Sequence, residues 1–106
     1  MHVVHAQRDL AGYWWLRLED PSRPEAHGEW VWRPGEAPEL CGVVFVSAEF
    51  GWWSRFVADA DLIAAIAYAP RRRIVQEAVD FWKNREIEVQ EVIERWYKTW
   101  NSPSNP

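Results

Sequence analysis

The sequence predicts an α+β fold: an antiparallel sheet of three or four strands in the N-terminal half, packed by a short helix and a long C-terminal amphipathic helix. Short segments between residues 13 and 48 are rich in aromatic and β-branched residues and are separated by turn residues. Beyond residue 58, apolar residues recur at spacings of three and four instead. The 106 residues fit one domain, expected over 1–101, with a frayed tail over 102–106.

The first predicted strand, 13–18, places two adjacent tryptophans on opposite faces, because successive strand side chains alternate. Trp14 shares its face with two leucines, so we assign it to the core. Trp15 shares its face with Tyr13 and Arg17, so we assign it to the wetter face.

Two further strands complete the predicted sheet. Segment 29–33 alternates in the same way, with Trp30 and Trp32 on one side. Segment 42–48 is an almost unbroken apolar run and is expected at the centre of the sheet. Segments 19–28 and 34–40 are expected to be loops, and segment 2–5 is expected to be a short edge strand.

The helical half begins with a short helix that Asp59 or Asp61 caps and that Pro70 ends. A long amphipathic pattern then runs from about 71 to 100. A straight helix of that length would measure ~45 Å, which exceeds the ~26 Å diameter of a compact domain of this size. We expect either a kink near Lys83–Asn84 or an end that projects beyond the sheet. The alternative is a helix that breaks in two and folds back.

The charge is unevenly distributed. The net charge is −4, yet residues 1–70 hold five basic residues against ten acidic ones, whereas residues 71–106 hold seven against six. An acidic front half disfavours nucleic acid and suits a basic protein partner. The longest apolar stretch, Leu62–Ala69, is too short to span a membrane, and the N-terminus has no secretory-signal pattern. Cys41 is the only cysteine, so we expect no internal disulfide and a cytoplasmic location.

Nine tryptophans are more than a core of this size is expected to hold. Tryptophan is enriched where proteins dock, because its large rigid ring contributes contact area. The main hypothesis is therefore a noncatalytic protein-binding module, homodimeric through the 71–100 helix. Its candidate contact residues are Trp52, Trp53, Ile93, Trp96 and Trp100.

The alternative hypothesis is a module that binds a small ligand, either a saccharide or a nucleotide. Three tryptophans would form an aromatic platform, and an arginine cluster at the start of the long helix would contact an anion. The same cluster has two other interpretations, a solvated or internally paired group and a contact for a partner's acidic patch. The residues are Trp15, Trp30, Trp32, Arg71, Arg72 and Arg73.

Metal, cofactor and catalytic chemistry are not expected. The imidazole and thiol groups are those of His2, His5, His27 and Cys41. They lack the close spacing of a zinc site. No nucleophile elbow or phosphate-binding loop occurs in the sequence. An unrecognised enzyme is the third hypothesis, for which paired carboxylates are available at Glu29, Glu49, Asp59 and Asp61.

A short, acidic, aromatic-rich chain with one cysteine and no catalytic motif resembles the small bacterial or phage-encoded proteins that inhibit a larger protein. Anti-defence inhibitors and toxin-immunity proteins are of this type. The resemblance implies function by binding alone and gives no individual residue a role.

Overall fold

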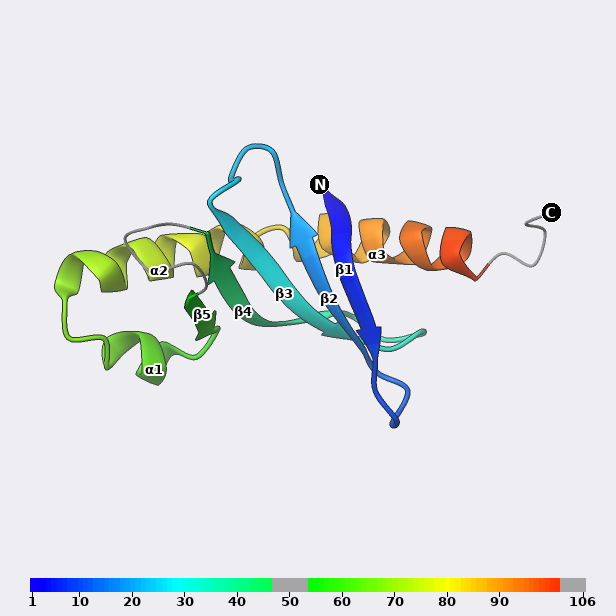
Figure 1. Cartoon of the computed structure of the whole chain (residues 1–106), viewed down its shortest axis with the longest axis horizontal. Coiled ribbons are helices and arrows are strands. Elements are labelled where there is room, and N and C mark those ends of the chain that lie inside the picture. The colour runs from blue at the N-terminus through cyan, green and yellow to red at the C-terminus, as the bar shows by residue number, and fades with distance from the viewer. Residues whose placement is uncertain (47–53, 102–106) are drawn as a thin grey trace.

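A computed structural model of the chain describes residues 1–46 and 54–101, and it consists of a five-stranded sheet followed by three helices (Figure 1). The α+β class is confirmed, with five strands in place of three or four. The elements are β1 (His2–Arg8), β2 (Trp14–Glu19), β3 (Ala26–Trp32), β4 (Glu39–Phe45), β5 (Ser54–Val57), α1 (Ala60–Ala64), α2 (Ala69–Lys83) and α3 (Glu86–Trp100).

The sheet is an antiparallel meander in which each strand pairs with its neighbour in the chain, in the order β1-β2-β3-β4-β5. Its central strand is β3, so the expectation that 42–48 lies at the centre is wrong. β4 is second from one edge, because β5 pairs on its outer side. The sequence pattern does not predict β5, whose four residues are too few to establish an alternation.

Two strands have ends that differ from the predicted ones, because cross-strand pairing extends them. Residues 26–28, expected in a loop, belong to β3, where His27 pairs with Val44 and Gly28 with Val43. β1 extends to Arg8, beyond the predicted edge strand 2–5, because its whole length pairs with β2. Backbone hydrogen bonding between strands therefore sets these ends, and local composition does not.

Helices α2 and α3 cover one face of the sheet, behind the strands in Figure 1. Trp14 points into this covered face and Trp15 points away from it, as predicted. Trp82 of α2 is completely buried, and its Nε1–H donates to the carbonyl of Ala26 at 3.0 Å. A Cβ added at Gly28 would lie 2.6 Å from the Trp82 ring, so this glycine makes room for the indole.

The long helical pattern is two helices, because it breaks at Asn84 and Arg85. The pattern expected over 71–100 is thus two helices, and the break between them lies where a kink was one of the expected alternatives. The helices do not fold back on each other. They follow one another along the covered face, and the C-terminal end of α3 extends past β1 (Figure 1). The Arg85 guanidinium lies over the Phe81 ring, 3.9 Å from its centroid, and donates to the Phe81 carbonyl.

The short predicted helix is α1, and Asp59 is its cap. One carboxylate oxygen of Asp59 accepts from the backbone N–H groups of Asp61 and Leu62, at 2.9 and 3.1 Å. Only Ile63 of this helix is buried. Pro70 lies in the first turn of α2, where its missing N–H costs no helical hydrogen bond.

Candidate functional site

The described tryptophans divide between core and surface. Four are buried, Trp96 is half-buried, and two are exposed. The exposed pair is Trp15, with 41% of its surface accessible, and Trp100, with 57%. Trp52 and Trp53, two of the predicted contact residues, lie outside the described residues. The four buried tryptophans are Trp14, Trp30, Trp32 and Trp82.

An aromatic cluster joins the end of α3 to one end of the sheet. The Trp14 ring meets Trp100 at a centroid separation of 4.9 Å and Trp96 at 5.2 Å, both edge to face. Tyr97 meets Trp32 at 5.2 Å in the same geometry. Such pairs gain about 0.5–1.5 kcal/mol each beyond the area that they bury. The last turn of α3 is therefore attached to the sheet, although the helix extends past β1.

The predicted contact residues of α3 differ in accessibility. Ile93 is completely buried in the core, so it offers no contact surface. Trp96 is half-buried within the aromatic cluster, and Trp100 is its most exposed ring. A hollow of about 340 Å³ lies beside Trp96, between the start of β1 and α3.

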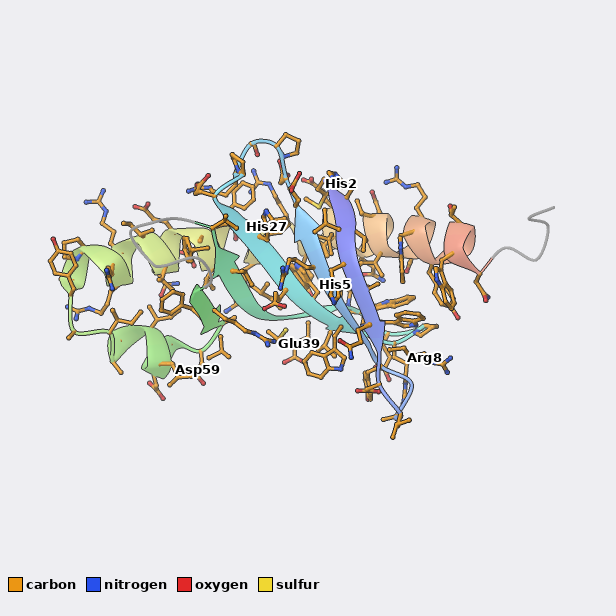
Figure 2. The ribbon with its side chains drawn as sticks, in the orientation of Figure 1. His2, His5, Arg8, His27, Glu39 and Asp59 are labelled. Carbon is orange, nitrogen blue, oxygen red and sulfur yellow. The ribbon has the colours of Figure 1, made fainter. Side chains whose placement is uncertain are left out.

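Within the described residues, no helix covers the other face of the sheet, which we call the open face. His2, His5 and His27, all the histidines of the chain, lie on it by strand alternation and pairing register, and are labelled in Figure 2. His27 contacts Glu19 at 3.5 Å, and His2 contacts the same carboxylate at 3.8 Å. Burial lowers the pKa of His27, and the neighbouring Glu19 charge opposes that shift.

Two arginines on the open face share one carboxylate. Glu29 of β3 is paired with Arg55 of β5, at 2.8 Å from Nε, and with Arg17 of β2, at 3.8 Å from Nη2. Only 14% of the Glu29 side chain is exposed. The Cys41 thiol donates to the Glu29 backbone carbonyl at 3.2 Å, and burial raises the pKa of this thiol. A raised pKa keeps the thiol protonated and unreactive at neutral pH.

Trp15 stands beside this group in a fixed orientation. Its Nε1–H donates to Asp9 Oδ2 at 2.9 Å, while Asp9 Oδ1 accepts from the backbone N–H groups of Ala11 and Tyr13. These bonds, the Trp15 bond above all, lower the pKa of Asp9. A hollow of about 310 Å³ lies between the Trp15 ring and the arginine–glutamate group.

The structure does not bring the alternative ligand residues together. Trp30 and Trp32 are buried on the covered face, whereas Trp15 lies on the open face, so the three form no common platform. The arginine cluster lies in the first turn of α2, at the opposite end of the molecule from the start of β2 (Figure 1). There Arg72 donates to the carbonyl of Ile66, and Arg73 pairs with Glu77 at 3.1 Å.

The sequence pattern does not predict most of the open-face group. Alternation placed Arg17 beside Trp15, but only the pairing register brings Glu29 opposite Arg17 and brings Arg55 within reach. It also missed Trp14 and Tyr97 as partners of Trp100. The i,i+3 spacing of Tyr97 and Trp100 was an available signal.

The carboxylates considered for catalysis do not converge. Glu49 lies outside the described residues, Asp59 caps α1, and Glu29 is held in its ion pairs. Among residues 1–46 and 54–101, no group of three histidine, cysteine or acidic side chains could hold a metal ion. In those same ranges, no helix has the length and apolar character to cross a bilayer. No family model, curated protein or solved structure matches the chain.

Proposed function

We propose that the protein is a noncatalytic protein-binding module whose contact surface is the C-terminal end of α3, centred on Trp100 and Trp96. The observation that carries this proposal is the exposure of Trp100, at 57%, on top of an otherwise packed aromatic cluster. Tryptophan is among the residue types that are enriched at binding hot spots.

The cluster is suited to binding because its rings are immobilised before a partner arrives. The Trp100 ring contacts Trp14 edge to face and stacks on Tyr97 with an interplanar angle of 21°. Binding to such a surface loses little side-chain entropy, since the rings have few rotamers left to lose. The hollow beside Trp96 offers space for an apolar side chain of the partner.

The partner we propose first is a second copy of this chain, with α3 at the interface. An isologous dimer would use the same surface patch, around this exposed ring, on both copies. A larger protein inhibited by this module, as bacterial or phage inhibitors and immunity proteins act, is the second partner class.

Light scattering coupled to size exclusion at micromolar concentration tests the dimer. We expect the wild type at twice the 12.5 kDa chain mass and Trp100→Ala at the chain mass. Lys98→Ala, an exposed change two residues away on α3, is the matched control and should remain dimeric. A monomeric wild type would remove the dimer from the proposal.

Affinity capture from the native cell then tests the larger partner. Proteins retained by the wild type and by Lys98→Ala, but lost with Trp100→Ala, support binding through α3. If the chain is monomeric and its captured proteins do not depend on Trp100, the proposed function is wrong. Far-UV circular dichroism of each variant checks that the fold is intact.

A further inference from the structure

The exposed ring at the end of α3 is too small a surface to hold a dimer by itself. A tryptophan side chain can bury about 150–250 Å², so the exposed 57% of Trp100 offers roughly 90–140 Å². Each partner in a stable complex buries about 800 Å². A dimer centred on this end must therefore use a neighbouring element, and the hollow beside Trp96 joins α3 to the start of β1.

β1 is an edge strand of the sheet. In the order β1-β2-β3-β4-β5, no strand among the described residues pairs with its outer side. The outward N–H and C=O groups of such an edge are a template for pairing with another chain. Many proteins protect their edges with lysine, proline or other charged residues, whereas the segment HVVHAQ of β1 contains no lysine, proline or acidic residue.

We propose that two copies of the chain join through antiparallel pairing of β1 with β1 of the partner, which makes one continuous sheet of ten strands. This inference rests on the dimer proposed above and names the element that completes its interface. The C-terminal end of α3 extends past β1 on the covered face (Figure 1). A partner sheet joined at β1 would continue over that end, so the two α3 ends would lie together beneath the junction.

The two faces of β1 restrict the register of this pairing. His5 and Gln7 lie on the open face and Ala6 lies on the covered face, as their pairing with β2 shows. Directly opposite residues of an antiparallel pair share a face of the sheet. When a strand pairs with its own copy about a two-fold axis, this requirement places one residue opposite itself.

A β-bulge limits where the two strands can meet. The register with β2 shifts between Val3 and His5, and a bulge bends an edge strand so that it pairs poorly. The regular part that remains is His5–Arg8. Its two central residues, Ala6 and Gln7, are therefore the candidates for the position that faces its own copy.

Cysteine crosslinking tests this register, in a Cys41→Ser background that removes the only native thiol. Opposite residues of an antiparallel pair have Cα atoms about 4.5–5.5 Å apart, a separation that a disulfide can span. We expect mild oxidation to crosslink Ala6→Cys or Gln7→Cys chains into dimers. His2→Cys, on the same strand, is the matched control and should stay uncrosslinked, because its two copies would lie more than about 20 Å apart.

Hydrogen exchange read by mass spectrometry gives a second measurement, on the unmodified chain. Peptides from β1 should exchange at least roughly tenfold more slowly in the dimer than after dilution to the monomer. Peptides from β5, the opposite edge of the sheet, are the internal control and should exchange equally in both states.

Light scattering establishes first whether the wild type is a dimer, and a monomeric wild type overturns both this inference and the α3 dimer. In a dimer, the β1 pairing is overturned if neither Ala6→Cys nor Gln7→Cys crosslinks, if His2→Cys crosslinks as well, or if β1 exchange does not change. Each of these three results leaves the α3 dimer standing. Circular dichroism of the cysteine variants checks that their fold is intact.

Discussion

At the scale of single residues, the buried Trp82 ring limits the size of the side chains beside it. Its ring is completely buried against β3, and its N–H group is satisfied by the carbonyl of Ala26. Such a bond matters because an unpaired buried N–H would cost about 1–3 kcal/mol. The space that the ring occupies is the space that a side chain at Gly28 would need.

Gly28→Ala is therefore expected to lower the free energy of unfolding by about 1–3 kcal/mol, because an added methyl group overpacks a rigid ring. Urea denaturation followed by circular dichroism measures the change. In a Trp82→Phe background the smaller ring should reduce this penalty. An equal penalty in both backgrounds would show that the Trp82 ring is not its cause.

At the scale of elements, each strand of the sheet has two different sides. β2 and β3 place apolar residues on the covered face and charged or partly exposed residues on the open face. At the break between α2 and α3, Arg85 contacts the ring and the carbonyl of Phe81 and so stabilises the last turn of α2. A guanidinium on an aromatic face is worth about 0.5–1 kcal/mol at an accessible position.

Arg85→Ala should accordingly lower the free energy of unfolding by about 1 kcal/mol, through loss of the ring contact and of the bond to the Phe81 carbonyl. Arg85→Lys keeps the charge without the planar group and should recover only part of the loss. Arg95→Ala, an exposed change on α3, is the control, with an expected effect within about 0.5 kcal/mol. Equal effects of Arg85→Ala and Arg95→Ala would contradict the role of the Phe81 contact.

At the scale of the whole molecule, burial is concentrated between the sheet and the two long helices. β2 and β3 lie inside the sheet and carry most of its fully buried side chains. By contrast, α1 has five residues and one buried side chain. Local stability follows buried contacts, so the parts of the molecule should open with different free energies.

Hydrogen exchange read by mass spectrometry measures this difference. We expect peptides from β2 and β3 to exchange slowest and peptides from α1 to exchange fastest among the described elements. The control is the same experiment with Gly28→Ala, which should speed exchange in β3 while leaving α1 little changed. Exchange from α1 as slow as that from β3 would contradict the distribution of stability described here.

Much of the fold was predictable from local pattern. Alternation placed Trp14 and Trp15 on the correct faces, and the preference of aspartate for helix caps gave Asp59 as one of two candidates, of which the structure shows Asp59. The position of β4 in the sheet was not predictable, because it depends on β5, a strand with no strong pattern of its own. A kink near Asn84 was one of three arrangements that the size of the domain allowed, and the size did not decide between them.

The candidate sites were less predictable than the fold. Trp100 and Ile93 were both predicted as contact residues; Trp100 is exposed, whereas Ile93 is buried because α3 turns that side toward the sheet. The group of Arg17, Glu29 and Arg55 depends on the pairing of three strands, which no local pattern encodes. Side chains that meet through register are found only once the register is known.

The sequential order of the sheet has a consequence for how the chain is made. Every strand can pair as soon as its neighbour leaves the ribosome, and such local pairing favours rapid formation. The layer that shields Trp30 and Trp32 from water, however, is synthesised last, because it comes from α2 and α3. A chain that ends before residue 69 would lack both helices, so the apolar face of its sheet would be exposed to water and would favour aggregation.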